Sequence, residues 1–317
     1  MRVPAPAGLA IVAAETDADL EAMIAVRTAA DPDRPPPRIE NLRHNLSAQA
    51  GLVYLVARFD GTPVGCGFVY PDFAEHAEAH VVVVPDARRR GIGSALLARV
   101  GAVARAASKH ELEGELRESD EQSRAWVERR GYRVVGGEKA VALDVAHIDL
   151  PAPSLPPGVC IVSRAGRPDL VDALYPIGAD AAEDIPGHPA RPTYEQWRAI
   201  DIDRPTRDPE FFFIALAGDE PVGYATIDNF GADAYHGLTA VKRTWRRRGV
   251  ATALKQAQIA AAKKAGFRRL VTASEERNTP MRNLNAKLGY RPEPSLSTLV
   301  LRGPAAEHCA AASSERP

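Results

Sequence analysis

A long internal repeat constrains this chain more than any other feature. Five residues of the first copy, Arg88, Gly91, Leu96, Gly131 and Tyr132, recur 158 positions later as Arg246, Gly249, Leu254, Gly289 and Tyr290. No gap is needed within this stretch. Self-similarity over such a period indicates that one structural unit occurs twice in the chain. The 317 residues therefore divide into two units of similar size, each large enough to bury a core.

The copies differ in length near their starts. Gly8–Met23 matches Gly158–Leu174 at an offset of 150, so the second copy holds eight more residues before its central strands. The segment between the copies, PAPSLPP, has four prolines in seven residues, which favours an extended, stiff connector. We predict domains at residues 1–150 and 158–303, a linker at 151–157 and a frayed tail at 304–317.

Composition excludes several classes of protein. Lys and Arg number 40 against 41 Asp and Glu, a balance that argues against a nucleic-acid binder. The longest aliphatic run, Val81–Val84, is too short to cross a membrane, and the start lacks the pattern of a signal peptide. Three cysteines without pairing or metal-ligand spacing fit a reducing compartment. We expect a cytoplasmic protein with no metal and no nucleic-acid or membrane partner, whose oligomeric state stays open.

Each copy repeats one order of expected elements: strand, helix, Pro-rich region, hairpin, strand, long helix, strand, helix and last strand. The turns DGTP and GDEP join the two hairpins. The predicted strands include Ala10–Ala13, Leu52–Phe59, Val64–Val69 and Leu112–Leu116, then Val159–Ser163, Phe211–Ala217, Val222–Ile227 and Arg269–Ser274. This order predicts an α/β fold, a mixed sheet with flanking helices.

An arginine-rich turn lies between a strand and a long helix in each copy, at Arg88–Ser94 and Arg246–Thr252. A helix start offers unpaired N–H groups and the positive end of the dipole, and glycine lets an anion approach the backbone. The turn therefore predicts a pyrophosphate site. A solvated basic cap is the alternative, and its occurrence in both copies disfavours it. No P-loop or dinucleotide fingerprint is present.

The pattern Arg-x-x-Gly-x-Gly/Ala, which follows a strand and opens a helix, resembles the acyl-CoA signature of the GNAT superfamily of N-acetyltransferases. Gly131-Tyr132 and Gly289-Tyr290 agree with it. The resemblance covers essentially the whole chain as two tandem GNAT acyl-CoA N-acyltransferase folds, a two-unit architecture like that of mycothiol synthase. It implies acetyl-CoA as co-substrate and direct attack by a primary amine of a small molecule.

The resemblance also implies which residues hold acetyl-CoA. In this family the strand before the turn splays from its neighbour, and a freed backbone N–H holds the thioester carbonyl. Asp120 stands in the first unit where the second has Asn278, which resembles a family residue that contacts CoA. The implied CoA-binding residues are Val83, Arg88, Arg89, Arg90, Gly91, Gly93, Ser94, Val241, Arg246, Arg247, Arg248, Gly249, Ala251, Thr252 and Asn278.

The catalytic groups are expected at two places in each unit. Tyr290, or Tyr132 in the first unit, stands where many members keep a tyrosine as general acid, although a Gly-Tyr at a helix end can simply pack. Members often place a Glu or His base on the strand before the turn. Glu78, His80 and His236 are the candidates, with a water chain as the alternative.

The second unit is expected to be the catalyst, since it has Asn278, Tyr290 and the longer variable region. In that region, Ala179–Tyr194, Glu183 and Asp184 are expected to bind the amine. The first unit's Pro-rich segment Asp31–Leu46 is the alternative acceptor wall. A non-catalytic acyl-CoA sensor and a protein N-acetyltransferase remain open. An aminoacyl-tRNA-dependent transferase is disfavoured because both arginine-rich turns are present.

Overall fold

The computed structural model describes residues 6–71, 75–148, 154–185 and 191–305. Parts of three predicted segments lie outside these ranges: residues 151–153 of the linker, 186–190 of the second unit's acceptor wall, and 306–317 of the tail. We call residues 1–150 the first half and residues 158–305 the second half.

The elements follow the same order in both halves. The first half contains β1 Leu9–Ala13, α1 Asp17–Ala30, α2 Ile39–Ala48, β2 Val53–Phe59, β3 Thr62–Tyr70, β4 Ala77–Val83, α3 Ile92–Ala106, β5 Glu111–Arg117, α4 Glu121–Glu128 and β6 Arg133–Asp144. The second half contains β7 Val159–Ser163, α5 Tyr175–Glu183, α6 Tyr194–Trp197, β8 Phe213–Ala217, β9 Glu220–Phe230, β10 Asp233–Val241, α7 Val250–Lys264, β11 Arg269–Glu275, α8 Thr279–Lys287, β12 Arg291–Pro292 and β13 Thr298–Pro304.

The predicted strands are confirmed, with ends that differ by at most three residues. The first hairpin turn holds Asp60 and Gly61 at φ values of +48° and +83°, the backbone that a tight hairpin requires. The helix expected after the strand Val159–Ser163 does not begin around Leu170 and Leu174. That stretch forms two short 3₁₀ turns, and α5 starts at Tyr175 with Pro176 in its first turn, where proline is tolerated.

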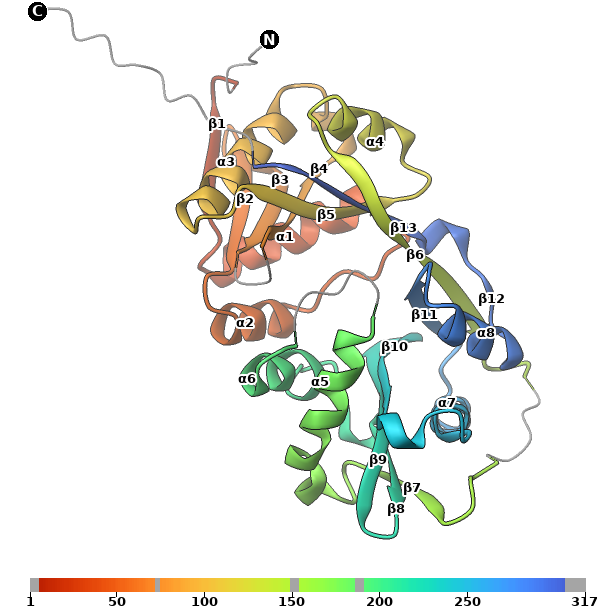
Figure 1. Ribbon diagram of the computed structural model, residues 1–317. Helices are drawn as coiled ribbons and strands as arrows, with labels where there is room; N and C mark the ends of the chain where they lie inside the picture. Colours follow the sequence, from red (N-terminus) through yellow and green to blue (C-terminus); the bar gives the residue numbers. More distant parts are fainter. Residues whose placement is uncertain (1–5, 72–74, 149–153, 186–190, 306–317) are drawn as a thin grey trace, which may run out of the picture.

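The strands of the described residues join one sheet in the order β1-β2-β3-β4-β5-β13-β6-β11-β10-β9-β8-β7. The expectation that each unit ends with its own last strand is therefore wrong. β13, from the end of the second half, pairs with β5, whereas β6, from the end of the first half, pairs with β11 (Figure 1). Both last strands come from one repeated pattern. That pattern therefore does not specify which half of the sheet each strand joins.

Strand alternation explains why helices cover both faces of the sheet. In β2, Tyr54 and Val56 pack with α1, whereas Leu55 and Ala57 pack with α3. In the second half, Ile214 of β8 packs with α5 and Ala215 packs with α7. The two arginine-rich turns therefore open helices on one face, while α1, α2, α5 and α6 cover the other.

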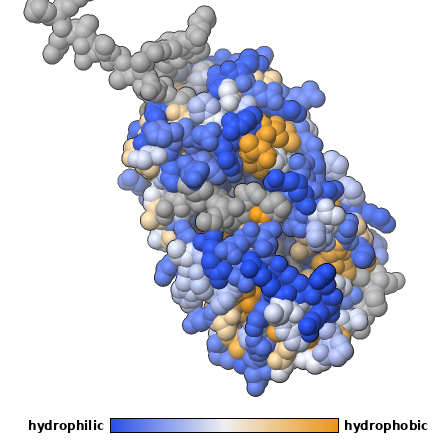
Figure 2. Space-filling model, viewed as in Figure 1, coloured by the Kyte–Doolittle hydropathy of each residue, from blue (hydrophilic) through white to orange (hydrophobic). Residues whose placement is uncertain are grey.

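None of the helices in the described residues is long and apolar enough to cross a membrane. The face of the molecule in Figure 2 is mostly hydrophilic, with small separate hydrophobic patches. Charged groups therefore cover much of this face.

Candidate functional site

Both arginine-rich turns have the same backbone. Arg89 and Arg247 adopt left-handed φ values of +62° and +59°, which are uncommon for a residue with a side chain. Gly91 and Gly249, at +84° and +90°, are the N-cap residues of α3 and α7, and no side chain caps either helix. The first N–H groups of both helices are left available, in a curved arrangement that suits an anion.

The first arginine of each turn has a structural contact that the signature did not reveal. Arg88 Nε donates to the Val83 carbonyl oxygen at 3.1 Å, and Arg246 Nε donates to that of Val241 at 3.1 Å. Each arginine therefore fastens the end of a strand to the turn that follows it. The remaining arginines of the two turns stay available to an anion.

The strand before each turn separates from its parallel neighbour, as the resemblance implied. β4 pairs with β5 only at Ala77↔Leu112 and Glu78↔Glu113, although both strands continue. β10 likewise pairs with β11 only from Asp233↔Arg269 to Tyr235↔Val271. Beyond these pairs, the backbone groups of β4 and β10 that face the parallel neighbour have no strand partner within the described residues.

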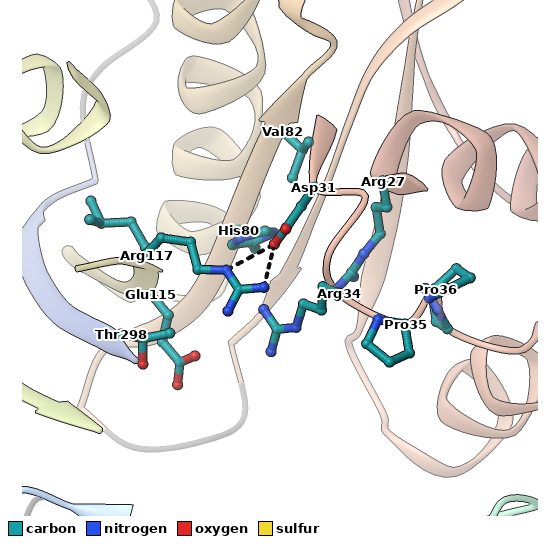
Figure 3. Close-up of a pocket in the computed structure, with 12 residues that line it drawn as sticks. Arg27, Asp31, Arg34, Pro35, Pro36, His80, Val82, Glu115, Arg117 and Thr298 are labelled. Atoms are coloured by element: carbon teal, nitrogen blue, oxygen red, sulfur yellow. Dashed lines mark hydrogen bonds and ion pairs between the residues drawn. The ribbon is translucent and has the colours of Figure 1, made fainter. Parts of the chain in front are cut away.

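A cavity of about 450 Å³ lies beside the splayed strands of the first half. It adjoins a smaller one of about 70 Å³, with which it shares Arg27, Arg34, His80 and Glu115 (Figure 3). Residues of the second half complete its wall, including Ile185, Glu275 and Arg277. The Pro-rich segment also contributes, because Pro35, Pro36 and Pro37 line the smaller cavity.

Three carboxyl groups that line this cavity, those of Glu78, Glu115 and Glu138, have raised pKa values. Burial raises the pKa of Glu78 to about 7, and repulsion from Glu115 and Glu113 adds to the rise. Burial likewise raises the pKa of Glu138 to about 7. A carboxyl group that titrates near neutrality can accept a proton at physiological pH, as a general base must. Glu78 is thus a predicted base that lines an open space.

His80 also lines the cavity, as strand parity predicted for a residue two positions from Glu78. Burial lowers the pKa of His80 to about 3, and the nearby Arg27 and Arg34 lower it further. His80 is therefore a neutral imidazole that contributes no positive charge to the cavity.

The matching region of the second half is filled. A Cβ at Gly237, which lies in the bulge of β10 between His236 and Thr239, would lie 2.7 Å from Nη2 of Arg207. Arg207 is 4% exposed, and it donates to Asp228 Oδ2 at 2.6 Å and to the Asp201 carbonyl oxygen at 2.7 Å. A buried guanidinium thus occupies the position where the first half has its cavity.

His236 and Tyr290, the catalytic candidates of the second half, lie in its core. Tyr290 is 3% exposed, and its hydroxyl group contacts Nε2 of His236. His236 Nδ1 lies 2.9 Å from Gln258 Oε1. Burial raises the pKa of Tyr290 and, with the charge of Lys255, lowers that of His236. The two side chains contact each other rather than an open space.

Lys255 belongs to the same buried cluster. It is 1% exposed, and its Nζ lies 5.6 Å from the centre of the Tyr290 ring. Burial lowers the pKa of Lys255 to about 7. On α7, Val250 and Leu254 are buried, and Lys255 and Gln258 are more buried than Ala257 and Ala261, so the buried face of this helix includes polar side chains.

Tyr132, the other predicted acid, is a core residue of the first half. It is 9% exposed, its hydroxyl group donates to the Pro304 carbonyl oxygen at 3.3 Å, and Gly303 packs against its ring. Burial raises the pKa of Tyr132 to about 12. The exchanged strand β13 therefore packs against the Tyr132 ring.

Glu183 and Asp184 do not face an open acceptor site. Asp184 Oδ2 lies 2.6 Å from Nη1 of Arg246, and both acids lie 3.3 Å from Nη2 of Arg243. Burial opposes the shift, but Arg246 and Arg243 hold the pKa of Asp184 below its usual value. These acids therefore offset the positive charge of the second turn.

Asn278 and Ser94, which the resemblance implied as CoA contacts, also form hydrogen bonds within the chain. Asn278 and Asp120 are the N-cap residues of α8 and α4, where their side chains accept from Met281 N at 3.3 Å and Ser123 N at 2.9 Å. Their difference therefore leaves the cap intact. Ser94 accepts from Nη2 of Arg130 at 3.1 Å.

The sequence analysis missed Arg27, Arg34, Glu115, Glu138 and Arg207. One signal was available in β5, where Glu111, Glu113 and Glu115 alternate with less polar residues and so lie on one face. The other residues come together only through tertiary packing.

Family models match residues in both halves of the chain. The model of the acetyltransferase (GNAT) family matches residues 173–290, and that of the acetyltransferase (GNAT) domain matches residues 50–134. No curated protein sequence matches the chain.

Solved structures show the same tandem arrangement. A tandem GNAT protein from the clavulanic acid biosynthesis pathway is 23% identical, with a TM-score of 0.74 over 95% of this chain and 99% of that one. A GCN5-related N-acetyltransferase from Sphaerobacter thermophilus is 20% identical, with a TM-score of 0.73 over 95% and 96%. Together with the two matched ranges and the duplicated splayed strands, these findings show that the chain belongs to the GNAT acetyltransferase family and carries two GNAT domains in tandem.

Proposed function

We propose that the protein is an acetyl-CoA-dependent N-acetyltransferase that modifies a primary amine of a small molecule, and that its first half catalyses the reaction. One observation carries this proposal: the cavity of about 450 Å³ reaches the splayed β4 and β5 and is lined by Glu78. Its volume is within the usual range for small-molecule sites.

The turn residues Arg89–Ser94 would hold the CoA pyrophosphate, with Val83 beside the pantetheine arm. The left-handed backbone and the uncapped start of α3 fit this polyanion. When bound, acetyl-CoA supplies the thioester. In the second half, Arg247–Thr252 would hold a second CoA in a site without acceptor space, because Arg207 fills that space.

Glu78 would take the proton that the amine loses as its nitrogen bonds to the acyl carbon. Because the pKa of Glu78 is about 7, its carboxylate accepts a proton at neutral pH and its acid form can return one to the departing sulfur. Neither Tyr132 nor Tyr290 is needed for this transfer. This assignment moves the chemistry from the second half, where the sequence placed it, to the first.

Acetyl-CoA consumption with a panel of primary amines tests the proposal. We expect transfer to at least one small amine, with mass spectrometry showing one added acetyl group. CoA binding without transfer to any amine would instead support the non-catalytic sensor.

A further inference from the structure

The cavity of the first half contains charged groups of both signs that lack partners in the chain. Several of its arginines are paired: Arg117 with Asp31 at 2.9 Å, and Arg302 with Glu113 at 2.6 Å. Arg27 and Arg34 are different, since neither side chain makes a hydrogen bond or ion pair within the described residues.

The two arginines lie on one side of the cavity. Arg27 extends from α1 and Arg34 from the segment that follows it, and the Arg34 side chain points toward the side of the cavity where Glu115 lies (Figure 3). Burial lowers the pKa of Arg27, and the charge of Arg34 adds to this effect. Arg34 also lowers the pKa values of Glu115 and Glu138, so it feels their charge without a direct ion pair. Two guanidinium groups that make no direct ion pair can still bind a carboxylate.

The unpaired acids lie on other walls. Glu115 belongs to β5, Glu138 to β6 and Glu78 to β4, and none of the three carboxyl groups has an ion-pair partner within the described residues. An ammonium group placed among them would supply the missing positive charge. The cavity thus has basic and acidic side chains, without direct ion pairs to one another, on different elements of its wall.

We propose that the acceptor is an amino acid or a similar small zwitterion, whose carboxylate binds Arg27 and Arg34 and whose amine lies among Glu78, Glu115 and Glu138. This inference rests on the proposed function, because it assigns the acceptor of that same site. A diamine would satisfy the acids and leave the two arginines unpaired, so it fits the cavity less well.

Matched acceptor pairs test the inference. L-lysine is compared with 1,5-diaminopentane, and 5-aminopentanoate with pentylamine, so that each pair differs by one carboxylate. We expect kcat/KM to be at least about tenfold higher for the carboxylate-bearing member, the loss typical of an unpaired charged contact. Equal or better use of the simple amines overturns the inference while leaving the acetyltransferase proposal intact.

Arg34 provides the variant test, since it is exposed and its replacement leaves the core intact. For Arg34→Gln we expect a rise in KM of about tenfold for the carboxylate-bearing acceptors only, with kcat nearly unchanged. Arg34→Lys should restore part of the affinity. Arg38→Gln, at an exposed arginine outside both cavities, is the control. An equal effect of Arg34→Gln on both members of a pair contradicts the inference.

Calorimetric titration of wild-type protein with 5-aminopentanoate separates the two proposals. Binding that depends on Arg34, without acetyl transfer to any amine, retains the ligand class and removes the enzymatic function. Transfer to amines without binding of 5-aminopentanoate retains the function and removes the ligand class.

Discussion

The two halves keep the same arginine-rich turn but differ in what lies beside the splayed strands. Beside Glu78 and His80 of β4 the first half has a cavity, whereas beside Gly237 of β10 the second half has the guanidinium group of Arg207. The first cavity leaves Glu78 accessible and titrating near pH 7, while the second region joins Arg207, Asp228 and Thr206 to Asn41 of the first half. Both halves therefore keep the arginine-rich turn, and in the described residues the turn of the first half is combined with a cavity of about 450 Å³.

Removal of the base should have the largest effect on this contrast. Glu78→Gln keeps the shape of the side chain but cannot take a proton, so we expect kcat/KM to fall by about 10²–10⁴-fold. In the wild type, kcat/KM should rise with pH up to about 7, as Glu78 loses its proton, and Glu78→Gln should lose that rise. The measurement is initial rate between pH 5.5 and 9. A wild-type rate and pH profile in Glu78→Gln would remove Glu78 as the base.

Replacement of Arg207, which fills the space beside Gly237 in the second half, should lower stability rather than turnover. Arg207→Met leaves Asp228 buried without its closest partner, which should lower the free energy of unfolding by about 3–5 kcal/mol. Arg204→Met is the control, because Arg204 is a third exposed and lies 3.9 Å from Asp228. Urea unfolding measures the stability, and turnover is compared per folded molecule. A large loss of turnover in Arg207→Met with stability unchanged would place chemistry in the second half.

The stability of the second half should depend on pH because Lys255 is buried. The pKa of Lys255 is about 7 in the folded chain and near 10.5 when unfolded, so the unfolded state binds the extra proton between these values. Stability should therefore rise with pH from about 7 to about 10 and be lowest below 7. Lys255→Met should raise the free energy of unfolding at pH 7 by about 1–3 kcal/mol and remove that rise. Urea unfolding at several pH values checks both; a less stable Met variant would oppose this account.

Loss of the Tyr290 hydroxyl group should have the smallest effect. Tyr290→Phe leaves Nε2 of His236 without its contact, so we expect a loss of stability of about 1 kcal/mol and turnover within about twofold of wild type. Thermal unfolding and initial rates test this together. A hundredfold loss of turnover would return the general acid to the second half.

Local patterns were sufficient to predict the strands, the two hairpins and the two turns. Gly91 and Gly249 report a left-handed backbone that few other residues accept, and strand parity placed Glu78 and His80 on one face. Long-range features were not predictable. The exchange of β6 and β13 depends on which of these two equivalent strands pairs with β5 and which pairs with β11. The arrival of Arg207 over Gly237 depends on packing between elements far apart in the chain.

A titration combined with turnover tests the central claim, that both halves bind CoA and the first half reacts. Gly91→Asp and Gly249→Asp each place a carboxylate at a helix start, where it repels a pyrophosphate; both strain the same left-handed backbone, so each variant is the other's control for folding. Wild type should bind two CoA molecules, and each variant one. Gly91→Asp should lose turnover by about 10²-fold or more, whereas Gly249→Asp should keep at least about a third. The reverse pattern, with turnover lost only in Gly249→Asp, would contradict the assignment of catalysis to the first half.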